Sequence, residues 1–593
     1  MATAPAFTPS WMMRLSNSQA QSIQLREHQR VVEREGQMPT NQLSPSTRGW
    51  LRFLHRKATT PDDWSSAGRP ASWWDDRSTP PVLNFPRFDL SESSYAIPMM
   101  ADVTPAWREV YVEIMDGLLA RHTTHWAAID WLTQIGHDPD RGHYPQEYVD
   151  LWLPKHLVGR YDMPGWTANG VEPWGLAPDP VGAEGNLFFK GWFNLMLGFH
   201  AYVSRDRRWN EPFTVTGLDD QTFSWTHDGI NALLVRQWTR RPEGPHCENT
   251  KIWPYCLSAA GLGLLMHDHL TGRQDHWVYD RWLEIARQRF LGLTPGGRVE
   301  WMALYHDPLE NYTHRAGPTT GLSVAIYLLP QDRDLAEILY RTAVDKIGWS
   351  DPARLVRTQP DPRFLLLGLV LAREFGDEIT LARLTEYAQT HFEPTYRGDG
   401  GDEFGWRFGL DEPYPRGQLN ALLMMADIGE PGAWRRVFTQ PNLVKFDQPT
   451  VSDVDFPNLG IAEAWNDQTT DILHIGTYAA TASQRRAPTA FRITQLPDAS
   501  TCVVRCDGAP YPRWRATDAH SIQIDLDIDD HHIQVFTTTA AELTASAPTG
   551  FREETRVPPQ ARPAPTVQRS TLDVATTPDL GLPEIPRPPC ACC

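Results

Sequence analysis

Apolar residues recur at helical spacing through the middle of the chain, from about residue 105 to residue 444. Around Ile114 they return every three or four positions, as on one face of an amphipathic helix. The Gly- and Pro-rich loops over 163–185 and 294–317 are long enough to be functional. Paired helices with such loops are typical of an α/α toroid, and a helical repeat array is the alternative, although the sequence shows no fixed period. The periodicity predicts helices over 108–119, 187–202, 255–270, 319–329, 334–347, 364–375 and 418–426.

Both ends of the chain differ from this helical segment. Residues 1–104 are polar and Pro-rich, and we expect an arm that is packed on the surface or partly disordered, with one helix near 19–35. Residues 445–545 alternate in the manner of strands and predict a small β-rich domain. Residues 546–593 are rich in Pro, Thr and Ala, which predicts a disordered tail. The strands are expected over 472–475, 490–493, 501–505, 522–526 and 532–536.

Composition narrows the class of partner. A net charge of -18 over 593 residues argues against nucleic acid and anionic membranes. No apolar stretch is long enough for a transmembrane helix, and no secretory signal is present, so we expect a cytoplasmic protein. Seven unevenly spaced Cys do not form a disulfide framework. The 24 Trp suit either an aromatic-lined cleft for a carbohydrate or isoprenoid, or simple core filling.

The most unusual segment is HCENTKIWPYCL, residues 246–257. Pro254 suits the first turn of a helix, so Cys256 falls in that turn and Cys247 in the preceding loop. A helix N-terminus favours negative charge and can lower the pKa of a thiol, so two thiols facing one cavity can act as an acid/base pair. The alternatives are small buried hydrophobic residues, a redox disulfide, or zinc ligands together with His246 or with His267 and His269, although the spacing matches no standard zinc pattern.

Two other segments add to this constellation. Asp116 lies beside the apolar stripe of helix 108–119, where a carboxylate is costly unless it is hydrogen-bonded or functional. A solvated position at the flank of the stripe is the alternative. The segment 185–198 reads as a core helix with Asn186 at its N-cap and two glycines for close packing.

Together, these three segments resemble the linalool dehydratase-isomerase family over about residues 105–435. The resemblance rests on NLFFKGWFNLMLGFHAY followed by D-R-R-W, on C-E-x7-C running into SAAGLGLLMHDHLTG, and on residues 367–377. It implies an (α/α)6 barrel with a central apolar cavity, here followed by the small β domain. It also implies dehydration and isomerisation of a tertiary allylic terpene alcohol without metal or organic cofactor, and a ring-like homo-oligomer in which a neighbour lines the cavity.

The resemblance assigns residues and also shows departures. The two family cysteines match Cys247 and Cys256, and the catalytic aspartate is placed on Asp116. A family tyrosine six residues after the aspartate then falls on His122, and a family histidine falls on Trp192. A further tyrosine falls on Pro318. Because polar wall residues are replaced while the thiols are kept, we expect a different and larger isoprenoid or polyketide-like substrate.

These residues suggest a division of roles. We expect Cys256 to act as base and Cys247 as acid, Asp116 to orient or share the proton, and His122 to relay it or bind the substrate. The acid and base act on an apolar small molecule that loses its hydroxyl. The expected substrate-binding residues are Trp192, Trp253 and Tyr255, whose rings shield an allylic cation, and Glu248, which anchors the loop.

Three alternatives stay open. A carbohydrate-active toroid would use paired carboxylates, for which Asp402 with Glu403 and Asp411 with Glu412 are the candidates. A terpenoid or polyketide cyclase would use the same barrel and thiols to close a ring. A non-enzymatic binding protein is the third, and the retained thiols argue against it.

Overall fold

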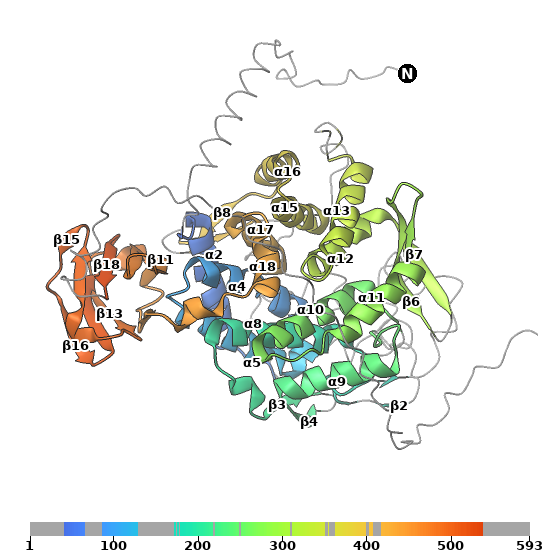
Figure 1. Cartoon of the computed structure of the whole chain (residues 1–593), viewed down its shortest axis with the longest axis horizontal. Coiled ribbons are helices and arrows are strands. Elements are labelled where there is room, and N and C mark those ends of the chain that lie inside the picture. The colour runs from blue at the N-terminus through green and yellow to red at the C-terminus, as the bar shows by residue number, and fades with distance from the viewer. Residues whose placement is uncertain are drawn as a thin grey trace, which may run out of the picture.

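The structure is a computed structural model of the chain and describes residues 41–65, 86–128 and, with short gaps, 171–537. A helical body forms most of the molecule, and a β domain stands at one side of it (Figure 1). The helix expected near 19–35 and the tail from residue 546 lie outside the described residues. The gaps fall at 173–174, 177, 218–219, 248–250, 309–310, 350, 352–353, 355–361, 399–401 and 407–416.

All seven helices predicted from apolar periodicity are present in the helical body. Four more helices were not predicted from the sequence. The predicted helices are α5 (Glu109–His122), α8 (Leu187–Ser204), α10 (Pro254–Thr271), α12 (Gly321–Leu328), α13 (Arg333–Ile347), α15 (Pro362–Phe375) and α17 (Gly417–Ile428). The additional helices are α9 (His227–Arg240), α11 (Trp277–Arg289), α16 (Glu378–His391) and α18 (Ala433–Thr439).

The described parts of the expected N-terminal arm are buried helices. These are α2 (Pro45–Thr59), α3 (Pro86–Glu92) and α4 (Ala96–Val103). Ser44 caps α2 by accepting the Thr47 N–H, and Pro45 occupies its first turn. Trp50 and Tyr95 are almost fully buried, and α3 packs against α5, α8 and α17. Polar and Pro residues lie between the apolar positions of these helices, so the sequence does not show the apolar spacing that predicts a helix.

Short sheets also occur within the helical body, where the sequence predicts long loops. The stretch 294–317 forms most of a three-stranded antiparallel sheet instead of a loop. The fold is therefore mixed helix and sheet, and the closed (α/α)6 arrangement stays a prediction. The strands are β1 (Val171–Glu172), β2 (Gly175–Leu176), β3 (Phe213–Thr216), β4 (Thr222–Trp225), β5 (Leu291–Leu293), β6 (Val299–Asp307), β7 (Tyr312–Ala316), β8 (Thr395–Arg397) and β9 (Glu403–Gly405).

The β domain contains two antiparallel sheets, in which all five predicted strands are present. Buried residues alternate with exposed ones along these strands, so each sheet turns one face toward the interior. Backbone hydrogen bonds from Leu43 to Ala462 and from Ala106 to Ala464 join the domain to the helical body. The first sheet has the order β10 (Thr450–Ser452), β13 (Pro488–Thr494), β17 (Ser521–Asp527), β16 (Trp514–Asp518), and the second β11 (Leu459–Asp467), β12 (Ile472–Ala479), β18 (His532–Phe536), β14 (Val503–Cys506), β15 (Ala509–Pro510).

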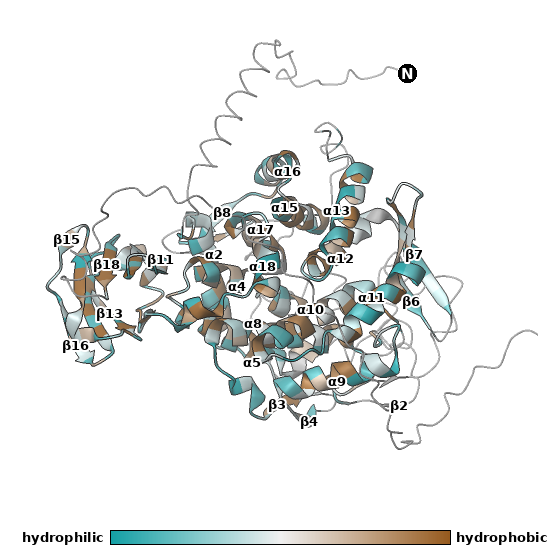
Figure 2. Ribbon diagram, viewed as in Figure 1, coloured by the Kyte–Doolittle hydropathy of each residue, from teal (hydrophilic) through white to brown (hydrophobic). Residues whose placement is uncertain are grey.

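Helices α8 and α10 form the centre of the helical body and lie against each other in parallel. Both carry mostly apolar residues (Figure 2). Glycines allow the close approach: a Cβ at Gly191 would lie 2.9 Å from the Cβ of Ala260, and one at Gly198 would lie 2.8 Å from Met266. None of the helices in the described part of the chain combines the length and apolar character needed to span a bilayer.

Candidate functional site

The two thiols predicted as an acid/base pair meet in the structure. The Sγ atoms of Cys247 and Cys256 are 3.5 Å apart, and both side chains are buried, reduced cysteines. Cys247 exchanges both backbone hydrogen bonds with Lys251, at 2.7 and 3.0 Å, which closes a tight turn. Ile252 then pairs with His306 of β6. The loop is thus held against a strand, and its first thiol faces the start of α10.

Each sulfur lies at the N-terminal end of a helix. The N–H of Phe188, the second residue of α8, donates to Cys247 Sγ at 3.2 Å, and Cys256 is the third residue of α10. The unpaired N–H groups and the dipole at a helix N-terminus favour negative charge. The Cys247 thiol in turn donates to Cys256 Sγ. The two sulfurs are therefore close enough for a proton to pass between them in either direction.

A buried cluster of hydroxyl groups lies next to the thiols along α10. Tyr255 precedes Cys256, and its hydroxyl donates to Glu92 Oε1 at 2.8 Å and lies 3.3 Å from the hydroxyl of Tyr327. Tyr327 shares a 2.7 Å hydrogen bond with Tyr95, which accepts the indole N–H of Trp192 at 2.6 Å. We call Glu92, Tyr95, Trp192, Tyr255 and Tyr327 the hydroxyl cluster. It joins α3, α8, α10 and α12 around one point.

Burial keeps the phenols of the hydroxyl cluster neutral. Desolvation raises the pKa of Tyr95, Tyr255 and Tyr327 well above the usual value of 10.0, and the nearby Glu92 carboxylate adds to the shift in each case. Arg363 opposes this at Tyr255, because its guanidinium donates to the Tyr255 hydroxyl at 2.5 Å and to Glu92 at 3.2 Å. Neutral phenols can donate hydrogen bonds to a substrate oxygen at neutral pH.

Aromatic rings connect the N-terminal end of α8 to the hydroxyl cluster. Phe88 stacks on Phe188 with ring centroids 5.6 Å apart and meets Trp192 edge-on at 5.8 Å. The Trp192 ring lies 5.0 Å from Tyr255. Two of the expected wall residues, Trp192 and Tyr255, are therefore neighbours on one aromatic surface. A cation beside these π faces would be stabilised by their quadrupoles.

The other two expected wall residues take different places. Trp253 is the N-cap of α10, and its ring packs 5.0 Å from Tyr305 of β6, on the side of the loop that faces the strand. Glu248 lies outside the described residues. Trp253 thus packs between the loop that carries Cys247 and strand β6, whereas Trp192 and Tyr255 belong to the hydroxyl cluster.

Asp116 lies elsewhere. Its carboxylate is 3.0 Å from His200 Nε2 and accepts a 2.6 Å hydrogen bond from Arg208, and its side chain is 34% exposed. His200 is 12 residues after Phe188 on α8, which corresponds to about 18 Å along the helix at a rise of about 1.5 Å per residue. The structure thus places Asp116 at the opposite end of α8 from the thiols.

His122 packs on the side of α8. Its ring stacks on Phe189 and Phe193, with centroids 4.7 and 4.9 Å apart, and its Nε2 is 3.4 Å from the Phe189 carbonyl. Cys247 is bound by the neighbouring residue, Phe188. His122 therefore supports the helix end that binds the first thiol.

Asp89 and Tyr95, which precede the segment that the family model matches, also have the spacing that the resemblance implies for an aspartate and a tyrosine. The family aspartate and tyrosine are six residues apart, and Asp89 and Tyr95 have this spacing. Asp89 is fully buried and pairs with the buried Lys57, whereas Tyr95 binds Trp192, which stands where the family has histidine. The six-residue spacing could have drawn attention to Asp89 and Tyr95 in the sequence. The polar residues around them, in and after α3, instead indicated an arm on the surface. Glu92 on the same helix was also missed.

The paired carboxylates of the carbohydrate alternative have structural partners. Arg52 lies 3.0 Å from Asp402, and Arg56 binds both oxygens of Glu403 at 2.5 and 2.7 Å. These contacts fasten β9 to α2. Asp411 and Glu412 lie outside the described residues.

A surface pocket of about 750 Å³ opens beside α2 and α5. It contains neither thiol and no member of the hydroxyl cluster. Its wall combines polar and charged side chains with the ring of Trp64, which is a poor match for an apolar substrate. The thiols and the hydroxyl cluster lie elsewhere, so this pocket is not part of the candidate site. It is lined by Thr59, Thr60, Pro61, Asp62, Trp64, Ser65, Ala120, Arg121, Thr124, Thr216 and Asp220.

Comparison with known proteins supports the resemblance. Residues 166–404 match the model of a family described as linalool dehydratase/isomerase, which confirms the resemblance inferred from the sequence. The match contains both thiols, Trp192, Tyr255 and Tyr327, and begins after α3 and α5. None of the curated proteins matches the chain.

One similar solved structure is Ara127N-Se, a GH127 beta-L-arabinofuranosidase from Geobacillus stearothermophilus T6. It is 8% identical, and the alignment covers 82% of this chain and 75% of that chain with a TM-score of 0.21. A TM-score this low carries no argument about fold or function.

Proposed function

We propose that this chain is an acid/base lyase or isomerase that acts on an allylic isoprenoid alcohol, with Cys247 and Cys256 transferring the protons. The observation that carries the proposal is the 3.5 Å contact between two buried thiols at the N-terminal ends of two helices. The family match over residues 166–404 supports a dehydratase or isomerase. The adjoining hydroxyl cluster supplies neutral donors for a substrate oxygen.

The proposed reaction needs an acid and a base that exchange roles. Cys247 protonates the leaving hydroxyl, the C–O bond breaks, and water and an allylic cation form. Cys256 then takes a proton from the carbon next to the cation, which gives an additional double bond. Each such role typically contributes about 10²- to 10⁴-fold to the rate. The proton returns from Cys256 to Cys247 across the contact between the two sulfurs, so the pair is restored after each turnover.

The surroundings of the thiols suit a cationic intermediate. The rings of Phe88, Phe188 and Trp192 supply π faces beside the N-terminal end of α8. The neutral phenol of Tyr327 donates a hydrogen bond to the substrate hydroxyl before it leaves, while Tyr255 donates to Glu92. In an isomerisation, Cys256 takes no proton from the cation; the released water instead adds at the other end of the allylic cation and gives its extra proton to the Cys247 thiolate, which restores the thiol.

Carboxylates act in this proposal by positioning other groups. Glu92 accepts from Tyr255 and Arg363 and fixes the orientation of both side chains. Asp89 fixes α3 through its buried pair with Lys57. Asp116 fastens the far end of α8 and takes no part in proton transfer.

Ring closure of a terpenoid or polyketide is the second candidate. Trp192 favours it, because a buried indole among phenols replaces a histidine that could titrate, and aromatic faces stabilise the successive cations of a cyclisation. Both candidates begin with protonation by the same thiol. They differ in whether the product has lost water or has only rearranged.

The test is an incubation of the purified full chain with a panel of linear isoprenoid alcohols of increasing length, followed by gas chromatography and mass spectrometry. Wild type is compared with Cys247→Ala and Cys256→Ala. A product lighter by one water that disappears in both variants supports the dehydratase. An isobaric product that disappears supports isomerisation or cyclisation. Products that persist in both variants at the wild-type rate overturn the proposal.

A further inference from the structure

Three potential metal ligands converge on the outer face of the β domain, far from the thiols in the fold. Glu463, His474 and His532 come from the adjacent strands β11, β12 and β18. Each offers one ligand atom, and these three atoms all lie within 4.8 Å of one another. The buried residues Leu473, Ile475, Ile533 and Val535 point to the other face, so the three ligands lie on the solvent side of the sheet.

The strand register explains why these three side chains meet. Gly476 of β12 pairs with Glu463 on one side and with His532 on the other. Gly476 has no side chain, so it leaves a gap between them, and a Cβ there would lie 3.4 Å from Glu463 Oε2. His474 is two residues earlier on β12 and therefore points to the same face. The glycine thus opens the space into which the three ligands converge.

The ligands are held in place, but their metal-binding atoms are not engaged. Glu463 Oε1 accepts the indole N–H of Trp465 at 2.7 Å, and the Trp465 ring stacks on His474 with centroids 4.6 Å apart. Within the described part of the chain, the ring nitrogens of His474 and His532 and Glu463 Oε2 make no hydrogen bond. Such support from a neighbouring residue, with the ligand atoms left open, is typical of metal sites.

We propose that Glu463, His474 and His532 bind a divalent transition-metal ion of the zinc class on this face. Two imidazole nitrogens and one carboxylate oxygen are ligands that zinc accepts in a four-coordinate site, and water fills the fourth position on an exposed face. The bound ion would hold β11, β12 and β18 together. This site is independent of the thiols and of the proposed reaction.

A neighbouring group is a weaker candidate. Cys506, Asp507 and His531 also lie close together. There, however, Asp507 already accepts from His531 at 3.0 Å and from the Cys506 thiol at 3.5 Å. These groups satisfy one another without an ion, whereas Glu463, His474 and His532 do not.

The experiment uses the full chain after chelator treatment and exchange into chelator-free buffer with a phosphine reductant. Co²⁺ is titrated while the visible spectrum is recorded, and Zn²⁺ is then added to displace it. Wild type is compared with Glu463→Gln, His474→Ala and His532→Ala. The matched control is His520→Ala, because His520 lies in the same domain and its Nδ1 is bonded to the Leu496 carbonyl. Thermal unfolding without metal checks that each variant is folded.

We expect wild type and His520→Ala to bind one equivalent of Co²⁺ more than the three ligand variants. The Co²⁺ bound at this site should give visible absorption bands. The spectrum should contain no sulfur charge-transfer band in the near ultraviolet, since no thiolate is a ligand. Affinity at this site should fall by more than about 100-fold when either histidine is removed. Equal stoichiometry in wild type and the ligand variants overturns the proposal. So does a sulfur charge-transfer band that disappears in Cys506→Ser.

Discussion

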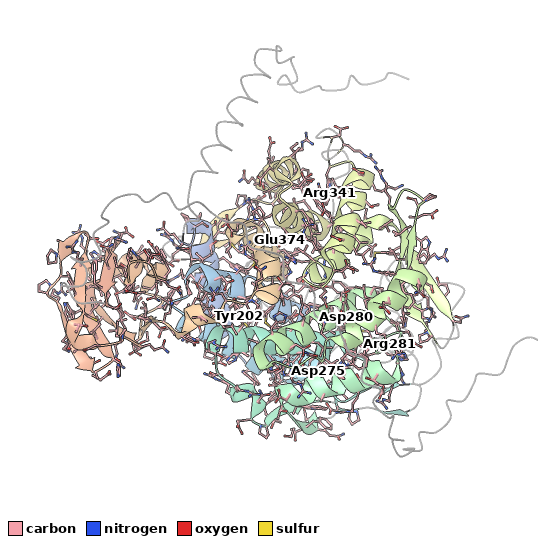
Figure 3. All side chains as sticks on the ribbon, viewed as in Figure 1. Tyr202, Asp275, Asp280, Arg281, Arg341 and Glu374 are labelled. Atoms are coloured by element: carbon pink, nitrogen blue, oxygen red, sulfur yellow. The ribbon has the colours of Figure 1, made fainter. Side chains whose placement is uncertain are left out.

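The two ends of the α8–α10 pair differ in burial and charge. The helices are parallel, so both N-termini meet at Cys247 and Cys256, and both C-termini meet near His200 and His267. The N-terminal end is buried, and its thiols and neutral phenols lie beside the buried carboxylate of Glu92, which is paired with Arg363. The C-terminal end is charged and partly exposed; Tyr202, labelled in Figure 3, marks it on α8 and donates to Asp102 at 2.7 Å.

The difference follows from the parallel arrangement. Two positive helix ends favour thiolate at one side, whereas two negative ends favour histidines and arginines at the other. Water screens the charges at the partly exposed C-terminal end. Ion pairs of this kind usually contribute about 0–1 kcal/mol each to the free energy of unfolding. Polar groups at the buried end have no water to replace a lost partner. We therefore expect catalysis to depend on the N-terminal end alone.

The largest expected effect is at Cys256. Replacement of Cys256 by Ser should lower kcat/KM by about 10²- to 10⁴-fold, because a serine hydroxyl stays protonated near neutral pH and cannot serve as base. Cys247→Ser should retain more activity, since a hydroxyl can still donate a proton. Steady-state rates, measured on the isoprenoid alcohol that the panel shows to be a substrate, give kcat/KM for both variants. Equal losses of less than about threefold would show that the thiols do not transfer protons.

Glu374 shows that burial can outweigh the charge-stabilising N–H groups of a helix N-terminus. It lies on α15 (Figure 3) and accepts the N–H groups of Trp434 and Arg435 at the start of α18, yet burial raises its pKa to about 7. The folded pKa lies above the usual value of 4.5, so the neutral form is favoured on folding. The contribution of neutral Glu374 to the free energy of unfolding is complete below pH 4.5 and is lost as the pH rises toward 7.

The corresponding prediction concerns stability. The free energy of unfolding of wild type relative to Glu374→Gln should fall by up to about 3 kcal/mol between pH 4.5 and pH 7, since one pKa unit corresponds to about 1.4 kcal/mol. Urea unfolding at several pH values measures it. A difference that is constant with pH would mean that the N–H groups outweigh burial, and the same dipole effect at Cys256 would then be stronger than we propose.

Glu92 tests the hydroxyl cluster. Glu92→Gln should lower kcat/KM by about 10-fold, because Tyr255 loses a charged acceptor and Arg363 keeps its positive charge beside the phenol. Removal of the carboxylate should also lower the pKa of Tyr255, since Glu92 raises it. The alkaline limb of the pH–rate profile should therefore move to lower pH.

The control for this prediction is Tyr255→Phe in the Glu92→Gln background, which should remove the shifted limb. A loss of activity with an unchanged pH profile would assign Glu92 a purely structural role.

The spacing of apolar residues along the sequence predicted much of the fold and half of the candidate site. Helical periodicity located α8 and α10, and Pro254 placed Cys256 in the first turn of α10. The strands of 294–317 were read as a loop, because Gly and Pro at the turns masked their alternation.

The remaining half of the site depends on long-range partners. Asp89 and Glu92 lie on a seven-residue helix among serines, and they are buried because Lys57 and Arg363 reach them from distant segments. Asp116 shows the opposite case, and its partly exposed position matches the alternative of a solvated flank. It lies beside an apolar stripe, as a buried acid would, but Arg208 and His200 hold it at a partly exposed helix end. Burial of a carboxylate is set by its partners and not by its neighbours in sequence.

The smallest effect is therefore expected at Asp116. Asp116→Asn should change kcat/KM by less than about threefold and lower the free energy of unfolding by less than about 1 kcal/mol, because a partly exposed ion pair with Arg208 is screened by solvent. Glu92→Gln provides the matched comparison, since it removes the same charge at the buried end. A 100-fold loss of kcat in folded Asp116→Asn would mean that the two ends are coupled in catalysis, and the proton would then have to pass along α8.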